Sequence, residues 1–294
     1  MTLKLPPVPN TYGVPHGLHL GIPMQPGEAA VTAAMDNFII DPRIHTWYNW
    51  SQHADVPMVY SVLSIGSMNA IRETIDRGDT NLWLIENEPS NVNEPSGQSR
   101  SLPLDVANAM KEIDGKIPWA GFGLLVNYNT SYWSRWLVQY FAAGGPMPDV
   151  WHIHVYSDFP QTWSLQLKDF AEWTIMTGRQ RPIIITECGG WPRNPMDEQA
   201  IIMEKIVETM INGIKVKVGG IDYTIPLDIV FWFSSFYPLW KPGDLLRRVS
   251  ETEYVKSWLG EKFMEAREAI KIGPPPPPPP PDPGHTIFLP GIQG

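Results

Sequence analysis

Residues 81–97 read NLWLIENEPSNVNEPSG, an apolar run followed by a polar loop in which NEPS occurs twice. The run from Asn81 to Asn87 is short, mostly apolar and followed by turn-forming residues, which is the pattern of a buried β-strand. Glu88 comes directly after this predicted strand, whereas Glu94 of the second NEPS lies inside a segment rich in Ser, Asn, Pro and Gly. We therefore expect Glu88 at the carboxyl end of a strand and Glu94 in a solvent-exposed loop.

The same alternation of apolar runs and amphipathic segments covers most of the chain. Strands are predicted over residues 18–22, 44–50, 56–63, 81–87, 117–126, 149–156, 181–188 and 228–234. Helices are predicted over residues 28–38, 67–77, 103–113, 131–141, 165–177, 197–214 and 253–270. Eight strands interleaved with helices predict an α/β fold of the (β/α)8 TIM-barrel type, in which one crossover, between Trp50 and Val56, is trimmed.

The C-terminal segment differs in kind from the rest. Eight consecutive prolines, Pro274 to Pro281, exclude a helix and favour an extended polyproline II spacer. We therefore expect a barrel domain over residues 1–272 and a disordered proline-rich tail over residues 273–294. The alternative is that the tail is a tether whose apolar residues 287–289 dock on a partner.

Composition narrows the class of protein. With 294 residues, 43% of them hydrophobic, the chain can bury a full core, and its net charge of −9 argues against nucleic acid or an anionic membrane as the main partner. The N-terminus MTLKLPPVPN contains no apolar run typical of a signal peptide, and no window approaches a membrane span, which predicts a cytoplasmic protein or one exported by another route. Thirteen tryptophans indicate a large aromatic core, or some that stack on sugar rings.

A second glutamate stands near the end of another predicted strand. The segment RPIIITECGGWP, residues 181–192, contains Glu187, which lies 99 residues after Glu88. A barrel of about 250 residues has eight βα units of about 31 residues each, so the two glutamates are three strands apart. Reacting groups in TIM barrels come from the carboxyl ends of strands. We therefore expect Glu88 on strand 4 and Glu187 on strand 7, facing each other across the barrel mouth.

The motifs around both glutamates resemble those of clan A of the retaining β-glycosidases. Asn87-Glu88-Pro89 and Thr186-Glu187 carry this resemblance, which extends roughly over residues 18–259. It implies that Glu88 is the general acid/base and that Glu187 is the nucleophile. Two shorter stretches are similar to the endo-β-1,3-glucanases of glycoside hydrolase family 128, namely WYNW at residues 47–50 and VPM at residues 56–58.

The resemblance also implies roles for residues around the pair. Asn87 would hydrogen-bond the sugar 2-hydroxyl, His154 would lie at the sugar, and Tyr156 would lie against the nucleophile. Retention requires an acid that is protonated and a nucleophile that is ionised at the working pH. We therefore expect burial and a nearby negative charge to raise the pKa of Glu88. Glu86 stands where clan members carry an apolar or small residue, and this third carboxylate would alter the titration of the pair.

Four further residues are predicted to contact the substrate. Asn49 and Trp50 lie at the end of strand 2 and Trp191 follows strand 7. The alternative for Trp50 and Trp191 is that they cap the barrel. Trp232, on strand 8, resembles the tryptophan that forms the floor of the cleavage subsite in clan A.

The pair His152-x-His154 allows a competing interpretation as two metal ligands of an amidohydrolase-like barrel. The other histidines do not complete such a set, which favours His152 as a packed interior residue and predicts neither a metal nor another cofactor. Cys188 is the single cysteine, so no internal disulfide exists. Because it follows Glu187 in the strand, it should point toward the helices as a small, inert, buried residue.

Two functions of different classes follow. The favoured one is a retaining endo-β-glycosidase that hydrolyses a β-glucan, with β-1,3-glucan preferred, by double displacement. Its partner would be a polysaccharide or oligosaccharide. The alternative is a non-catalytic carbohydrate-binding barrel on a cell-surface or virion assembly, in which the tail serves as a stalk. A pure binding protein has no need of both Glu88 and Glu187, which favours the enzyme.

Overall fold

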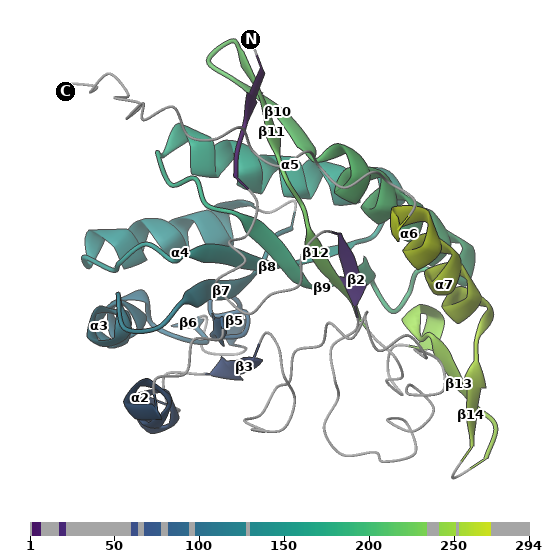
Figure 1. The fold of residues 1–294 in the computed structure, drawn as a ribbon, viewed down its shortest axis with the longest axis horizontal. Helices are drawn as coiled ribbons and strands as arrows, with labels where there is room; N and C mark the ends of the chain where they lie inside the picture. The colour runs from purple at the N-terminus through teal and green to yellow at the C-terminus, as the bar shows by residue number, and fades with distance from the viewer. Residues whose placement is uncertain are drawn as a thin grey trace.

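A computed structural model describes residues 2–6, 18–21, 60–63, 68–77, 82–93, 98–127, 130–233, 241–250 and 253–271. Its centre is a curled sheet of seven parallel strands, with helices on its outer side (Figure 1). The strands are β2 (His19–Gly21), β3 (Tyr60–Leu63), β4 (Trp83–Ile85), β7 (Trp119–Leu125), β8 (Val150–Ser157), β9 (Ile183–Gly190) and β12 (Ile229–Trp232).

The order of these strands follows the chain. The sheet runs β2-β12-β9-β8-β7-β4-β3, so within it each strand from β3 to β12 lies beside the strand of this sheet that follows it in the chain. The first strand, β2, pairs with the last, β12, with Leu20 opposite Val230. Pairing of the first strand with the last is what a closed barrel requires. The predicted α/β fold with a parallel sheet is confirmed, while the strand expected over residues 44–50 lies outside the described residues and the closed eight-strand barrel stays a prediction.

Six helices are described, and each follows one of the parallel strands at some distance along the chain. They lie within a few residues of the predicted positions, with two exceptions. The last helix begins five residues late. The helix predicted from residue 165 begins five residues early, with Pro160 in the first turn, where its missing N–H costs nothing. The helix expected over residues 28–38 lies outside the described part of the chain. The bounds are α2 (Met68–Arg77), α3 (Pro103–Ile113), α4 (Thr130–Ala142), α5 (Pro160–Met176), α6 (Met196–Asn212) and α7 (Trp258–Lys271).

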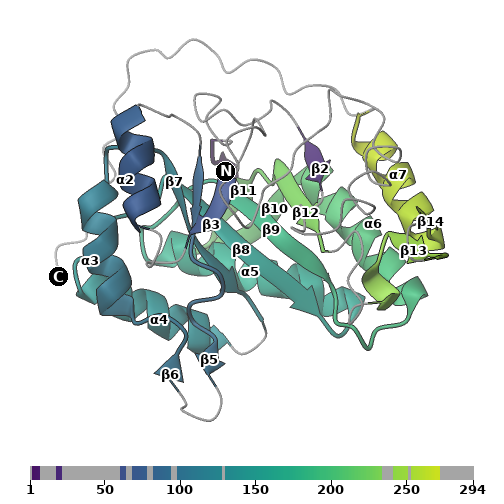
Figure 2. The ribbon, with the colours of Figure 1, turned by 90° about the horizontal axis from the view of Figure 1, so that it is seen from below.

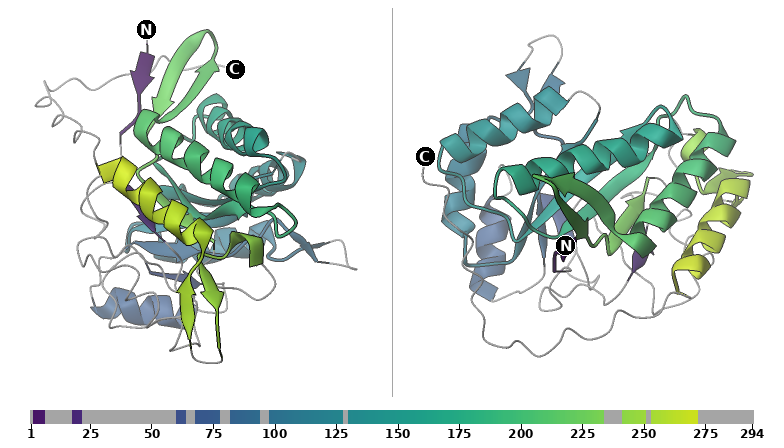
Figure 3. Two further views of the ribbon diagram at one scale, coloured as in Figure 1. Left: turned by 90° about the vertical axis from the view of Figure 1, so that its right-hand side faces the viewer. Right: turned by 90° about the horizontal axis from the view of Figure 1, so that it is seen from above.

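A hairpin that the sequence reading missed is inserted between α6 and β12. Strands β10 (Ile214–Val218) and β11 (Ile221–Ile225) are joined by Gly219 and Gly220, both at positive φ, which is the backbone of a two-residue hairpin turn. The N-terminal strand β1 (Thr2–Lys4) adds to β11 in parallel (Figure 3). The helix predicted to reach residue 214 therefore ends at Asn212, and Gly213 provides its positive-φ C-cap.

Two smaller hairpins complete the described structure. Strands β5 (Val92–Asn93) and β6 (Gln98–Ser99) form a short antiparallel pair that projects from the molecule beside α4 (Figure 2). Strands β13 (Leu246–Arg248) and β14 (Tyr254–Lys256) form another before α7, so that helix begins at Trp258 and not near residue 253. None of the described helices combines the length and apolar character that crossing a membrane requires.

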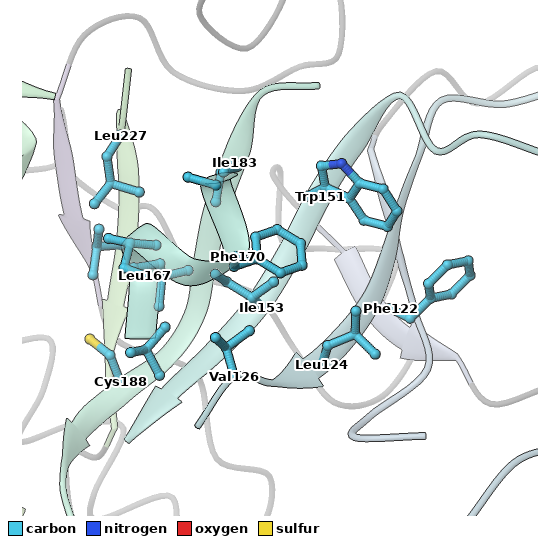
Figure 4. Packing of buried hydrophobic residues seen from close by; sticks show 14 of the residues in the cluster. Phe122, Leu124, Val126, Trp151, Ile153, Leu167, Phe170, Ile183, Cys188 and Leu227 are labelled. Carbon is cyan, nitrogen blue, oxygen red and sulfur yellow. The ribbon is translucent and has the colours of Figure 1, made fainter. Parts of the chain in front are cut away.

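The core has two parts because successive strand residues face opposite sides of the sheet. On the outer side, Trp151 and Ile153 of β8 pack with Phe170 of α5 beneath the helices (Figure 4). On the inner side lies a separate, smaller apolar cluster, which fills the amino-terminal half of the sheet's concave face. Its residues are Leu82, Leu84, Ala120, Val150, Ile184, Ile229 and Phe231.

The aromatic residues mostly serve the outer core. Among the described residues six tryptophans are fully buried, and Phe122 contacts Trp136, Tyr140 and Trp151 at ring-centroid distances of 4.7 to 6.3 Å. Packing of the helices on the sheet therefore accounts for six of the 13 tryptophans of the chain. The fully buried tryptophans are Trp119, Trp133, Trp136, Trp151, Trp163 and Trp232.

Candidate active site

Polar side chains line the carboxyl-terminal half of the inner face, beyond the apolar cluster. Along β8, Val150 belongs to that cluster, and His152, His154 and Tyr156 follow it on the same face toward the carboxyl end. His152 and His154 are fully buried, and Tyr156 is nearly so. The predicted shared face of these three residues is confirmed by their contacts with β4 and β9, which are described below.

Glu88 lies in the turn that follows β4, and its backbone is unusual. Both Glu86 and Glu88 have positive φ angles, 66° and 51°. This conformation costs about 1 kcal/mol or more for each non-glycine residue and persists only where the surroundings impose it. The N–H of Glu88 donates a hydrogen bond to the carbonyl of Gly123 at 2.9 Å, and the N–H of Asn91 donates to the carbonyl of Glu88 at 3.0 Å. The neighbouring strand β7 therefore helps to fix the position of Glu88.

Gly123 makes this arrangement possible. It has a φ of +60°, and the pairing of β7 with β8 shifts register between Phe122 and Leu124, as at a β-bulge. A Cβ atom on Gly123 would lie 3.0 Å from both the carbonyl oxygen of Glu86 and Cε1 of His152. Only glycine combines this φ angle with such a close approach of neighbouring groups.

The side chain of Glu88 is mostly buried and has partners on both oxygens. Oε1 lies 3.2 Å from Nδ1 of His154. Oε2 accepts a hydrogen bond from Nδ2 of Asn91 at 2.5 Å and one from Nη1 of Arg100 at 3.3 Å. Glu88 is therefore held between β8 and the segment that leaves β6.

Glu187 reaches the inner face through an irregularity in β9. Ile153 of β8 pairs with Ile185, but the next residue, His154, pairs with Glu187, so Thr186 is an extra residue in β9. With regular alternation Glu187 would share the outer face of Ile185. The bulge instead places Thr186 and Glu187 on the inner face, where Thr186 contacts His152.

The carboxylate of Glu187 is buried and hydrogen-bonded. The hydroxyl of Tyr156 donates to its Oε2 at 2.7 Å, as the resemblance implies, and Nδ1 of His154 lies 3.4 Å from the same oxygen. His154 Nδ1 therefore lies between Glu88 and Glu187. One carboxylate oxygen of each glutamate and this nitrogen all lie within 4.8 Å of one another, so the structure brings the predicted pair together.

The charges in this group stabilise one another. Burial alone would lower the pKa of His154, but the negative charge of Glu187 and the hydrogen bond and charge of Glu88 raise it above the ordinary value. Burial alone would raise the pKa of Glu88, but the hydrogen bond and charge of His154, then Arg100 and Asn91, lower it. The expectation of a raised Glu88 pKa is therefore wrong for this structure, because cationic and donor groups outweigh desolvation.

Glu86 has a hydrogen-bond partner outside this group. It is buried, and its Oε2 accepts a hydrogen bond from the Ser101 hydroxyl at 2.7 Å. The third carboxylate of the IENEP turn thus ties the turn to the segment before α3.

His152 is an interior residue whose two ring nitrogens are both engaged. Nε2 donates to the carbonyl of Ile85 at 2.8 Å, which leaves Nδ1 to accept from the hydroxyl of Thr186 at 3.1 Å. Burial lowers the pKa of His152 to about 3, so the ring is neutral. Neither nitrogen is free for a metal, which removes the paired-histidine interpretation. Within the described residues, the group that could geometrically hold a cation is Glu88, His154 and Glu187.

Two polar atoms of the site lack a hydrogen-bond partner among the described residues. They are Nε2 of His154 and Oδ1 of Asn87, and both are buried. Buried polar atoms are nearly always paired with protein, water or ligand. Asn87 and His154 are therefore the side chains of this site with bonding capacity left for a polar ligand.

Aromatic rings border the pair on the β9 and β12 sides. Trp191 is half-buried and stacks on Tyr156, with 5.1 Å between ring centroids and 30° between planes. The prediction for Trp232 is wrong by one residue: its ring is fully buried in the outer core, and its indole N–H donates to the carbonyl of Gly243 at 2.9 Å. The next residue, Phe233, faces the site, with its ring centroid 6.2 Å from that of Tyr156.

Other predicted residues lie elsewhere. Asn49, Trp50 and Glu94 are outside the described residues, as is the tail after residue 271. Cys188 is buried in the outer core, as predicted, and its Sγ contacts the carbonyl of Phe231 at 3.3 Å.

Sequence reasoning missed Gly123, Asn91 and Arg100. For Gly123 a signal existed, because a glycine inside the apolar run WAGFGLL indicates a bulge or a close backbone approach. For Asn91 and Arg100 the sequence carries no comparable signal, since their contact with Glu88 depends on the path of the β5–β6 hairpin.

Comparison with known proteins yields structures but no sequence relatives. No protein-family model matches the chain, and no curated protein matches it. The similar solved structures include members of glycoside hydrolase family 128.

Three of these structures represent different subgroups of the family. An endo-β-1,3-glucanase of subgroup II from Sorangium cellulosum is 18% identical, with a TM-score of 0.55 over 85% of this chain and 98% of its own. One of subgroup I from Amycolatopsis mediterranei, in complex with laminaritriose, is 18% identical, with a TM-score of 0.58 over 85% and 100%. A subgroup VII oligosaccharide-binding protein from Cryptococcus neoformans is 14% identical, with a TM-score of 0.53 over 87% and 95%. At these identities the likeness establishes the fold alone.

Proposed function

We propose that this protein is a retaining endo-β-glycosidase of the family 128 type that hydrolyses a β-1,3-glucan. The observation that carries the proposal is the approach of Glu88 and Glu187, whose carboxylate oxygens come within 4.8 Å of each other. Retaining enzymes hold their two carboxyl groups about 5 to 5.5 Å apart, whereas inverting enzymes need about 6.5 to 9.5 Å to admit a water molecule between them. The spacing in this site supports retention.

In the first step, Glu88 donates its proton to the oxygen of the leaving sugar while Glu187 attacks the anomeric carbon. The glycosidic bond breaks and a glycosyl-enzyme ester forms. In the second step, Glu88, now a carboxylate, takes a proton from water as the water oxygen bonds to the anomeric carbon and releases Glu187. The sugar leaves with its original configuration.

Two features of the surroundings support this division of roles, whereas the lowered pKa of Glu88 favours its base step over its acid step. Glu187 accepts the short hydrogen bond from Tyr156 and lies beside His154, and both contacts favour an ionised nucleophile. Glu88 is the more accessible carboxylate, with 15% of its side chain exposed against 8% for Glu187, as a group that must meet both the leaving sugar and water should be.

The site and the structural neighbours both support a glucan substrate. Oδ1 of Asn87 and Nε2 of His154 can pair with sugar hydroxyls, and the stacked rings of Tyr156 and Trp191 form an aromatic wall beside Glu187. Several neighbours of the same fold are endo-β-1,3-glucanases, and some of their structures contain laminari-oligosaccharides. Together these observations favour a β-1,3-linked glucan over other glycans.

A second candidate is a non-catalytic saccharide-binding barrel. It is favoured by one observation, that a neighbour of the same fold is described as an oligosaccharide-binding protein. The intact and closely spaced glutamate pair argues for the enzyme.

The test combines laminarin, laminari-oligosaccharides and aryl β-glycosides with good leaving groups. Glu187→Ala should abolish hydrolysis, because no glycosyl-enzyme can form, while oligosaccharide binding measured by calorimetry remains. Glu88→Ala should give a burst of aryl release followed by slow turnover, because the ester forms without acid assistance but lacks a base for its hydrolysis. Glu204→Ala, which removes an exposed glutamate of α6, serves as the control and should retain full activity.

Azide identifies the stereochemical role of each glutamate. It needs no base, so it should restore turnover in Glu88→Ala and yield a β-glycosyl azide. In Glu187→Ala it should attack from the vacated face and yield the α-glycosyl azide. If the wild-type protein and both variants bind laminari-oligosaccharides equally and none cleaves them, the binding barrel replaces the enzyme.

A further inference from the structure

The β5–β6 hairpin is attached to the turn that carries Glu88. The N–H of Arg100 donates to the carbonyl of Asn91 at 2.8 Å, and the N–H of Ser101 donates to the carbonyl of Pro89 at 3.3 Å. The carbonyl of Ser101 accepts a bond from the indole N–H of Trp136 on α4 at 2.9 Å. The base of the hairpin is therefore tied both to the Glu88 turn and to a helix.

This attachment brings two donors to one oxygen of Glu88. Asn91, before the hairpin, and Arg100, after it, both contact Oε2, while His154 contacts Oε1. The side chain of Arg100 is 46% exposed, so Arg100 contacts Glu88 from the solvent side of the site.

The charged groups that face Glu88 come from three elements of the described structure. They are His154 from β8, Glu187 from β9 and Arg100 from the segment after β6. Glu86, in the same turn, is directed to Ser101 instead. His154 is shared with Glu187, so Arg100 is the one cation in this set that contacts Glu88 alone.

A general acid and a general base need opposite things from such a cation. The acid step needs Glu88 in its protonated form, which a cation beside the carboxyl group disfavours. The base step begins from the carboxylate, which a cation and an amide donor stabilise. A permanent contact with Arg100 therefore favours the second step and limits the first at high pH.

We propose, on the basis of the function given above, that Arg100 is a positioning residue that acts beside His154 to favour the carboxylate form of Glu88 and so lowers the upper pH limit of the acid step. It does not touch the reacting atoms. Its influence is electrostatic and acts through Oε2 of Glu88.

The test is the pH dependence of kcat/KM for wild type, Arg100→Met and Arg100→Lys. Loss of the cation should move the alkaline limb to higher pH by roughly half a pH unit, the size expected for an ion pair with one exposed partner. Arg100→Lys keeps the charge and should leave the limb near its wild-type position. Arg72→Met removes an arginine of similar exposure, 49%, together with its ion pair to Glu112 on the outer helices, and should leave the profile unchanged.

A second readout does not depend on activity. In protein labelled with carbon-13 at the glutamate side-chain carboxyls, the resonance of Glu88 is identified by its absence in Glu88→Gln. Its titration midpoint should rise in Arg100→Met by the same amount as the kinetic limb. Arg100→Gln provides a second neutral variant if the methionine variant does not fold.

The outcomes separate this inference from the proposed function. If wild type hydrolyses β-1,3-glucan but the limb and the Glu88 midpoint stay within about 0.1 pH unit in both neutral variants, the role of Arg100 is refuted and the enzyme stands. A downward movement would also refute it. If wild type hydrolyses nothing but the midpoint rises, the Arg100 contact is real and the catalytic assignment fails.

Discussion

Replacing Gly123 by alanine should destabilise the protein by about 3 kcal/mol, the sum of two costs. An alanine at φ +60° is strained by roughly 1 to 2 kcal/mol. Its Cβ would also lie 3.0 Å from the carbonyl oxygen of Glu86 and from Cε1 of His152, and overpacking of this kind costs about 1 to 3 kcal/mol. At roughly 2 to 4 °C per kcal/mol for a domain of this size class, the melting temperature should fall by about 6 to 12 °C.

Gly115→Ala is the matched control. Gly115 has a φ of +72°, but a Cβ there would meet nothing within 4 Å. The variant therefore carries the backbone strain without the collision, and both alanines reduce the entropy of the unfolded chain equally. The difference in melting temperature between the two variants isolates the close approach at the β7 bulge.

Activity gives a second readout of the same substitution. The carbonyl of Gly123 accepts the N–H of Glu88, and the added Cβ would lie 3.3 Å from Nε2 of His154. Displacement of these groups by a fraction of an ångström should lower kcat about tenfold or more. If Gly123→Ala is as stable and as active as Gly115→Ala, in calorimetric and laminarin assays, the bulge does not position Glu88 and the reasoning fails.

Two predictions concern buried titratable groups. The pKa of His152 is about 3 in the folded protein, against 6.5 for an unperturbed histidine. Between these two values only the unfolded chain binds the proton. The free energy of unfolding should therefore fall by roughly 1 kcal/mol for each pH unit as the pH drops. His152→Gln should flatten this slope in urea unfolding between pH 4 and 6, and an unchanged slope would contradict the assignment. Burial, then the charge of Glu187, raises the pKa of Cys188, so iodoacetamide at pH 8 should modify it only after unfolding. Rapid labelling of the folded protein, followed by mass spectrometry, would show that the thiol is accessible.

The strands and the glutamate pair could be predicted because their signals are local. The apolar run before Glu88 and the one around Glu187 identify two strands, and chain order in a parallel sheet then places those strands three apart. The structure confirms that order and brings the two carboxylates together. Tyr156 and His154 followed from alternation along one regular strand.

The error at Trp232 comes from the resemblance and not from the strand pattern. Ile229 and Phe231 belong to the inner cluster, so alternation along β12 places Phe233 on the inner face and Trp232 on the outer one. For Glu187 alternation fails, because counting from Ile183 would have placed it on the outer side. Register shifts are settled by contacts between strands, which no single run of residues reports.

The direction of the Glu88 pKa failed for a different reason. The sequence suggested burial and neighbouring acids, but the hydrogen bond and charge of His154, followed by the charge of Arg100 from across a hairpin, outweigh the effect of burial. The β10–β11 hairpin was missed although its Gly219-Gly220 turn is a recognised signal, because the amphipathic pattern of α6 runs on to the start of β10.

The position of β1 has a practical meaning for how the protein can be handled. The hairpin to which β1 pairs links the end of α6 to the start of β12, so it lies at the amino-terminal ends of the parallel strands, opposite the end that carries Glu88 and Glu187. A biotin tag or surface anchor joined ahead of Thr2 would thus attach the molecule by the end opposite Glu88 and Glu187, so that the end carrying the glutamates faces the solution. Immobilised in this way, the protein would have the sensor surface on the side away from the two glutamates.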